Sequence, residues 1–203
     1  TVCLFTGEAG AGKTTMMLTL ADQITASGGV CLFNTAEESL YQTAMTAERL
    51  RLRKGFVTGN TADINELLAG AEKIMNKRVN KSKQFVMIVD SLQCLDDGKY
   101  SSGVKTSGTG IRCLEMITNF CKEHGAIAIV LGQVNKNGKM AGSNKLKHMV
   151  DSHMHLYVES KEADLLGCRV LMTTKNRFGG CGYQYFLSMG KTGFKLVAKV
   201  SSI

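Results

Sequence analysis

The segment Gly7-Glu8-Ala9-Gly10-Ala11-Gly12-Lys13-Thr14 matches G-x-x-x-x-G-K-[ST], the phosphate-binding loop of nucleotide hydrolases. Glycines let the backbone wrap closely around phosphate, so that successive N–H groups point inward at the start of a helix. We expect the Lys13 amine to reach the β- and γ-phosphates and the Thr14 hydroxyl to hold Mg²⁺. A structural glycine turn does not explain Lys followed by Thr at the helix start. The candidate nucleotide-binding residues are Gly7, Glu8, Ala9, Gly10, Ala11, Gly12, Lys13, Thr14 and Thr15.

Three acidic residues follow apolar runs and are candidates for metal binding and catalysis. Asp90 ends the run Phe85–Val89, where we expect it to complete the magnesium shell; the alternative is a turn cap. Glu37 and Glu38 follow the run Val30–Phe33, and a carboxylate there can polarise the water that attacks the γ-phosphate. Alternatively, both glutamates complement the dipole of the following helix. The residues alone leave these alternatives open.

Other polar residues stand at the ends of expected strands. Gln133 follows an apolar run and can sense the γ-phosphate by hydrogen bonding. Lys175, Asn176 and Arg177 end a later strand and precede Phe178 and two glycines, so the two cations can project towards a phosphate. If an adjacent subunit supplies that phosphate, they act in trans as fingers, for which rate effects of about 10³–10⁵ are typical. The alternative is a solvated turn.

The apolar pattern predicts an α/β fold with a mostly parallel central sheet, flanked by helices and followed by antiparallel strands. The expected strands are Val2–Phe5, Val30–Phe33, Phe56-Val57, Phe85–Val89, Ala126–Leu131, His153–Val158, Arg169–Thr174, Tyr183–Leu187 and Phe194–Val197. The expected helices follow Lys13, run from Ser39 to Leu52 and from Asp63 towards Arg78, and end near Gly125. The polar segments Leu95–Thr109 and Asn135–Asn144 are expected loops. We expect one domain over residues 1–203.

Composition limits the classes of protein. With 44% hydrophobic and 21% charged residues among 203, the chain is an ordinary globular sequence, and no apolar run reaches membrane-spanning length. The seven cysteines form no C-x-x-C pair, which favours reduced thiols over disulfides or a zinc site. The net charge of +8 suits a polyanionic partner, although a basic balance also aids solubility. Because the chain lacks an initial Met, we expect an excised domain or a compact relative of a longer protein.

Several segments together resemble the RecA-like ATPase core, most closely its RadA (Sms) branch. The string Lys175-Asn176-Arg177-Phe178-Gly179 is the most specific, because KNRFG is characteristic of RadA. The other matching segments, in order along the chain, are Gly7–Thr15, Phe33–Ser39, Ala47–Leu50, Val89–Gln93, Gly132–Gly138, Ala141-Gly142 and His148–Asp151. Two departures are noted: Gln133 replaces the histidine usual in RadA, and the zinc and Lon-protease-like modules of RadA are absent.

The resemblance implies an ATP- and Mg²⁺-dependent motor that forms a hexameric ring on single-stranded DNA and drives branch migration. It implies that Glu37 activates the water and that Lys175 and Arg177 reach the neighbour's nucleotide. It implies a cytoplasmic location, in a bacterium or a phage-infected cell, with recombinase or replication proteins as further partners and no membrane. DNA-contacting loops are implied at about 95–110 and 135–145, where basic residues cluster: Lys99, Lys105, Arg112, Lys136, Lys139, Lys145 and, at the border, Lys147.

Two other functions remain in view. One is a replicative helicase similar to DnaB, which shares the core and a similar basic finger, although the KNRFG string favours RadA. The other is a RecA-fold regulator that binds ATP to assemble with partners and hydrolyses it slowly. An ordinary solvated surface is the alternative for the basic loops. Since Tyr100 is the only aromatic residue in them, DNA binding would rest on phosphate contacts and depend strongly on salt.

Overall fold

The computed structural model describes residues 1–52, 55–100, 104–134 and 143–201. In this part of the chain the strands are β1 (Val2–Gly7), β2 (Val30–Thr35), β3 (Val57–Gly59), β4 (Phe85–Asp90), β5 (Ile127–Gln133), β6 (Ser152–Val158), β7 (Arg169–Asn176), β8 (Tyr183–Gly190) and β9 (Gly193–Ser201). The α-helices are α1 (Lys13–Ala26), α2 (Leu40–Arg49), α3 (Ile64–Met75), α4 (Ser107–His124) and α5 (Ser143–Met149), and two 3₁₀ turns cover Leu92–Cys94 and Ala163–Leu165.

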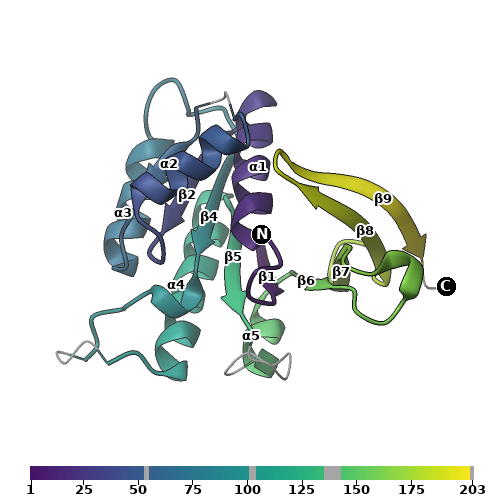
Figure 1. The fold of residues 1–203 in the computed structure, drawn as a ribbon. Helices are drawn as coiled ribbons and strands as arrows, with labels where there is room; N and C mark the ends of the chain where they lie inside the picture. Colours follow the sequence, from purple (N-terminus) through teal and green to yellow (C-terminus); the bar gives the residue numbers. More distant parts are fainter. Residues whose placement is uncertain (53–54, 101–103, 135–142, 202–203) are drawn as a thin grey trace.

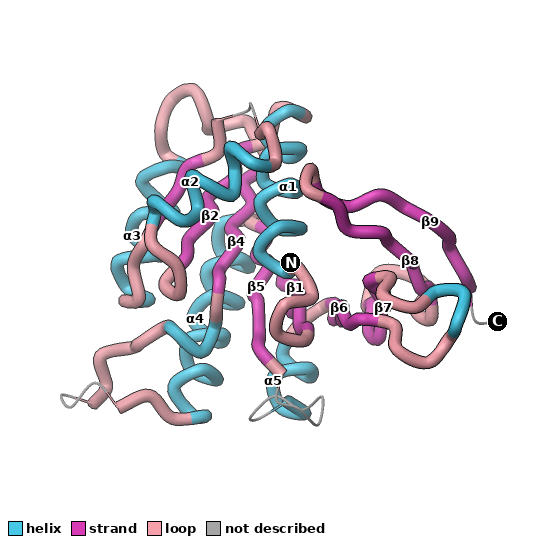
Figure 2. Tube along the Cα trace, viewed as in Figure 1, coloured by secondary structure: helices cyan, strands magenta, loops and turns pink. Residues whose placement is uncertain are grey.

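The strands form a single sheet in the order β3-β2-β4-β5-β1-β6-β7-β8-β9. All pairs from β3 to β6 are parallel, and the pairs from β6 to β9 are antiparallel. The helices gather around the parallel part, while β8 and β9 extend from it as a curved ribbon (Figures 1 and 2). The expected mostly parallel sheet with C-terminal antiparallel strands is confirmed.

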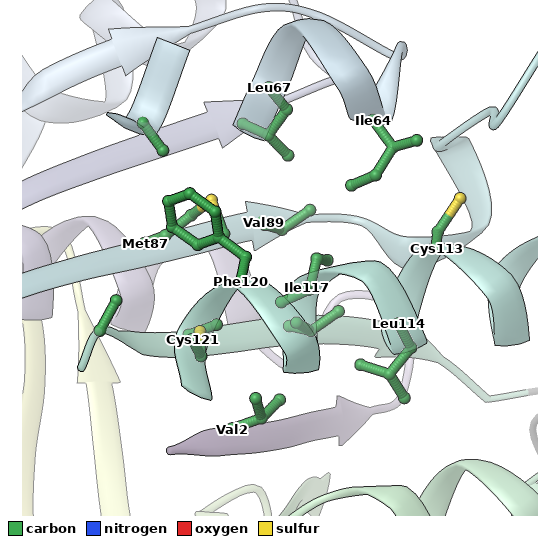
Figure 3. Packing of buried hydrophobic residues seen from close by; sticks show 14 of the residues in the cluster. Val2, Ile64, Leu67, Met87, Val89, Cys113, Leu114, Ile117, Phe120 and Cys121 are labelled. Carbon is green, nitrogen blue, oxygen red and sulfur yellow. The ribbon is translucent and has the colours of Figure 1, made fainter. Parts of the chain in front are cut away.

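Side chains of the central strands are buried on both faces of the sheet. In β4, Met87 and Val89 point into a core shared with α3 and α4, whereas Ile88 points into a second core with α1. This alternation explains why the central strands are continuous apolar runs in the sequence. Figure 3 shows the first core, in which Ile117 and Phe120 of α4 pack over these strands. The two cores hold the carboxyl ends of the parallel strands in fixed positions.

Local capping fixes where the helices begin. Ser39 caps α2 by accepting a hydrogen bond from the Gln42 amide, and the Gln42 side chain accepts one from the Ser39 amide in return. The Asp63 carboxylate accepts hydrogen bonds from two amides at the start of α3. Thr106 and Thr109 make the equivalent reciprocal pair at the start of α4.

Some expected boundaries were wrong. The segment Leu95–Thr109 is not a loop to its end, because the Thr106 cap starts α4 at Ser107. The third helix ends at Met75 rather than near Arg78, and a turn follows it. The sequence patterns did not predict α5, a short polar helix whose Leu146 is buried against the core. Most of the expected loop Asn135–Asn144 lies outside the described residues. In the described part of the chain, no helix is long and apolar enough to cross a membrane.

Candidate nucleotide-binding site

The phosphate loop lies between the end of β1 and the start of α1, as the motif requires. Gly12 has φ 101°, in the left-handed region that favours glycine. A Cβ on Gly7 would lie 2.5 Å from the Leu156 carbonyl oxygen of β6, so only glycine fits there. The Lys13 amine donates hydrogen bonds to the carbonyls of Gly7 (3.0 Å) and Glu8 (2.9 Å). The lysine thus folds back over the loop that would bind phosphate.

Most of the residues predicted from the sequence to bind nucleotide or metal, together with the catalytic candidates Glu37 and Gln133, line one cavity. Its volume is about 500 Å³, and it is lined by Ala9, Gly10, Gly12, Lys13, Thr14, Thr15, Glu37, Glu38, Asp90, Gln133 and Met189. The Thr14 hydroxyl donates a 2.9 Å hydrogen bond to the Asp90 carboxylate, so the two oxygens expected to serve Mg²⁺ are adjacent. Both are hard oxygen ligands of the kind that Mg²⁺ prefers.

Burial and charge perturb the ionisable groups of this cavity. Burial raises the pKa of Asp90 to about 6; the Thr14 hydrogen bond opposes this shift, and nearby Glu37 adds to it. Burial also lowers the pKa of Lys13, while Asp90 and the two nearby glutamates Glu37 and Glu8 counteract the shift. A buried carboxylate with too little positive charge around it is expected at a site that receives a cation.

Glu37 and Gln133 form a bridge across the sheet edge. The Gln133 amide donates a 2.6 Å hydrogen bond to the Glu37 carboxylate. Gln93 fixes the end of β5, because its side chain exchanges two 3.3 Å hydrogen bonds with the Gln133 backbone. The pair is therefore held at the carboxyl ends of the parallel strands, where Gln133 lies beside Gly7 of the phosphate loop.

The structure shows how the start of α2 is satisfied, and the alternative that the glutamates serve its dipole stays open. The helix is capped by Ser39 and Gln42, and no acidic residue lies in its first turn. Glu38 is tied to the backbone around it, since its amide donates to the Thr35 hydroxyl and its carbonyl accepts from the Asn60 side chain. Glu37 is the one whose carboxylate is hydrogen-bonded to Gln133.

Lys175 and Arg177 lie near the amino ends of the parallel strands, at the opposite end from the candidate site. Lys175 pairs with His153, the second residue of β6, and β6 starts beside the start of β1. The Lys175 amine donates 2.7 Å hydrogen bonds to the carbonyls of Lys147 and Val150, at the C-terminal end of α5. The Arg177 guanidinium donates a 2.8 Å hydrogen bond to Asp151. Neither residue lines the cavity around the chain's own phosphate loop.

The residues expected to contact DNA are only partly described. Lys136 and Lys139 lie outside the described residues. Arg112 forms an ion pair with Asp97, and its guanidinium lies 5.6 Å from the centre of the Tyr100 ring. Lys105 donates a hydrogen bond to the Cys94 carbonyl.

Lys99, Lys145 and Lys147 are exposed, and the Lys99 amine lies 5.9 Å from the centre of the Tyr100 ring. Lys99 and Arg112 thus both lie near the Tyr100 ring, and Arg112 alone of the two is paired with Asp97. A role for any of the named cations in DNA contact stays a prediction.

The sequence patterns missed residues that the ribbon β8–β9 and α2 bring to the site. Met189 lines the cavity, and a Cβ on Gly12 would lie 2.7 Å from the Phe194 ring. Arg49 donates to the Thr15 hydroxyl (3.4 Å) and to the Lys191 carbonyl (2.9 Å). The segment containing Arg49 was part of the RadA resemblance, but no spacing signal assigned it a role. Met189 and Phe194 carried no signal at all.

Solved structures with a similar fold define the class. An ATPase domain matches with a TM-score of 0.81 at 15% identity, covering 97% of this chain and 84% of that domain. A KaiC-like protein from Pyrococcus horikoshii matches with a TM-score of 0.74 at 17% identity, covering 98% of this chain and 89% of that one. A DnaB-like replicative helicase matches with a TM-score of 0.76 at 14% identity, covering 95% of this chain and 56% of the helicase. The chain has the RecA-like ATPase fold.

Comparison of sequences then identifies relatives of this chain among the RadA proteins. No protein-family model matches. The chain is 32% identical over 200 residues to the DNA repair protein RadA of Rickettsia conorii, which is 98% of this chain and 43% of that protein. It is 31% identical over 201 residues to RadA of Aquifex aeolicus, covering 99% of this chain and 43% of the relative. The chain is therefore a homologue of the RadA proteins and spans less than half of their length.

Proposed function

We propose that this chain binds and hydrolyses ATP with Mg²⁺ and acts as a motor on single-stranded DNA in recombination or repair. The observation that carries the proposal is the single cavity in which the phosphate loop, Asp90, Glu37 and Gln133 meet. The RadA relatives are named DNA repair proteins, and the basic residues near Lys99 and Lys145 suit a polyanion. The proposal includes branch migration and a ring of six subunits. It also includes the assignment of residues 1–203 to a single ATPase domain.

Each side chain has a role in this proposal. Thr14 and Asp90 would hold Mg²⁺, which neutralises charge on the β- and γ-phosphates when bound. Lys13 would leave its two loop carbonyls and contact the phosphates. Glu37 would orient the attacking water and accept its proton, and Gln133, hydrogen-bonded to it at 2.6 Å, would detect whether the γ-phosphate is present.

The test is the rate of ATP hydrolysis with and without single-stranded DNA over a series of salt concentrations. We expect DNA to stimulate hydrolysis and the stimulation to fade with salt, because phosphate contacts release counterions. Glu37→Gln is expected to bind ATP but lower kcat by about 10²-fold or more. Glu38→Gln is the matched control and should retain most of the activity.

Two outcomes would contradict the proposal. If Glu38→Gln loses hydrolysis and Glu37→Gln does not, the catalytic carboxylate has been assigned to the wrong neighbour. Hydrolysis that is indifferent to DNA would favour an ATP-gated regulator instead of a motor. Lys13→Ala serves as the blank, since it removes the amine expected to contact the phosphates.

A further inference from the structure

The connection between α3 and β4 is strongly basic and lies outside the candidate nucleotide-binding site. Residues 76–84 read Asn-Lys-Arg-Val-Asn-Lys-Ser-Lys-Gln, with no acidic residue among them. We call this segment the basic turn. Its four cations, Lys77, Arg78, Lys81 and Lys83, are all exposed. The two ion pairs found in the described part of the chain, Arg112–Asp97 and Arg177–Asp151, involve none of them.

The basic turn is held in place at both ends. The Asn80 side chain donates a 2.8 Å hydrogen bond to the Ile74 carbonyl at the end of α3. Backbone hydrogen bonds join Asn80 to Lys77 (2.8 Å) and Lys83 to Asn80 (2.9 Å), forming two successive turns. The Gln84 carbonyl accepts from the Val30 amide at 2.9 Å. The cations therefore project from an ordered backbone, which lowers the entropy lost on binding.

The turn also borders a polar hollow. A cavity of about 270 Å³ is lined by Val30, Met75, Asn80, Lys81, Ser82, Lys83, Gln84, Phe85, His124 and Gly125. Lys81 and Lys83 supply positive charge to it, and Ser82 supplies a hydroxyl donor. Such a mixture of ammonium, hydroxyl and amide groups is what contacts phosphate and sugar in protein–nucleic acid complexes.

This surface is separate from the candidate nucleotide-binding site. The basic turn precedes the first residue of β4, whereas Asp90 and the loop that follows it leave the other end of the same strand. In Figure 1 the turn lies at the upper edge of the sheet, and β4 and β5 run away from it. A strand of six residues spans about 16 Å between its first and last residues.

Helix electrostatics explains only part of the charge. Cations near the end of α3 complement its dipole, and Lys73 already lies in its last turn. The dipole effect falls off within about one turn, so Lys81 and Lys83 gain little from it. A membrane surface fits less well, because the only large apolar side chain exposed on the turn is Val79.

We propose that the basic turn is a second nucleic-acid contact, which binds the phosphate backbone of DNA without reading its sequence. It has no aromatic side chain for stacking on bases, so its affinity is electrostatic. It lies outside the two loops implied by the RadA resemblance. A DNA strand held there would be an additional strand or a flanking segment, bound away from the nucleotide cavity.

The test measures binding of fluorescein-labelled single-stranded and duplex DNA by anisotropy over a salt series. The variant Lys81→Gln/Lys83→Gln is compared with Lys161→Gln/Lys195→Gln, which removes the same charge at exposed lysines elsewhere. Losing two phosphate contacts should reduce the slope of log K against log salt by about 1.4 for single strands or 1.8 for duplex. DNA-free ATP hydrolysis should be unchanged in both variants.

Three results would overturn the proposal. One is an equal loss of affinity in the two double variants, which would indicate a general charge effect. Another is wild-type protein that binds neither DNA. The third is binding to phosphatidylserine vesicles that needs Lys81 and Lys83 while DNA binding does not. Since DNA-free hydrolysis is measured in the same proteins, failure of the basic turn is distinguishable from failure of the proposed ATPase.

Discussion

At the scale of single residues, the buried carboxyl of Asp90 shows how a binding site lowers the free energy of unfolding. Its carboxyl is buried at the end of β4, and that burial raises its pKa to about 6 from 3.8. In the folded chain the group keeps its proton up to about pH 6, while the unfolded chain loses it near 3.8. The unfolded state therefore binds fewer protons between these values, and the free energy of unfolding falls as the pH rises through them.

We predict that Asp90→Asn stabilises the ligand-free protein at neutral pH. The amide keeps an oxygen for the Thr14 hydroxyl and removes the buried charge. A shift of about two pKa units corresponds to at most about 3 kcal/mol, so an increase of about 1–3 kcal/mol in the free energy of unfolding is expected. Urea unfolding between pH 5 and 8 measures it, and the advantage of the variant should shrink as the pH is lowered.

The same variant carries its own control. MgATP should raise the Tm of the wild-type protein, because a ligand that binds only the folded state stabilises it. Asp90→Asn should lose most of that increase, since it lacks the carboxylate proposed to hold the metal. A variant that is less stable at pH 7 and keeps the MgATP effect would contradict both the burial argument and the metal assignment.

At the scale of elements, Arg49 joins three parts of the chain. It lies in the last turn of α2 and bonds the Thr15 hydroxyl of α1 and the Lys191 carbonyl in the β8–β9 turn. Phe194, after that turn, lies against the phosphate loop at Gly12. The guanidinium therefore holds the antiparallel ribbon against the element that would cradle phosphate.

We predict that Arg49→Ala lowers the free energy of unfolding by about 1 kcal/mol, the typical net contribution of such hydrogen bonds. It should also weaken ATP binding, because the ribbon that carries Met189 to the cavity loses its anchor. Isothermal titration calorimetry measures the affinity. Lys191→Ala is the matched control, since Arg49 bonds its backbone carbonyl and the side chain is not needed. Equal effects of the two substitutions would refute the anchoring role.

The elements that could be predicted from the sequence are those marked by a pattern of neighbouring residues, such as an apolar run or a short motif. The apolar runs of β2 and β4 are buried on both faces, so their positions were readable, as was the phosphate loop between β1 and α1. The start of α4 was missed because Thr106 and Thr109 make a cap without an acid or an apolar signal. Met189 and Phe194 could not be assigned to the site, because their place depends on how a ribbon far along the chain folds back.

At the scale of the whole molecule, the sheet separates the phosphate loop from Arg177, the two groups proposed to contact the phosphates of ATP. The phosphate loop follows the last residue of β1, while Arg177 lies beside Asp151, whose carboxylate also accepts a 2.9 Å hydrogen bond from the Val2 amide. The length of β1, about 16 Å from Val2 to Gly7, stands between them. Arg177 therefore cannot reach the nucleotide of its own chain unless the fold changes. The candidate partner for its guanidinium is the nucleotide bound by a second copy of this chain.

We predict that Arg177→Ala lowers the rate of ATP hydrolysis by about 10³-fold or more, with little loss of ATP affinity. Mixing it with Lys13→Ala protein should restore part of the rate, because an intact phosphate loop then faces an intact Arg177 from the other copy. Steady-state hydrolysis at several mixing ratios measures this. Asp151→Asn is the control, since it breaks the 2.8 Å ion pair but leaves the guanidinium available. The cross-subunit role is wrong if Asp151→Asn is equally inactive and the mixture shows no restored ATP hydrolysis. Arg177 would then act through its ion pair with Asp151 within its own chain.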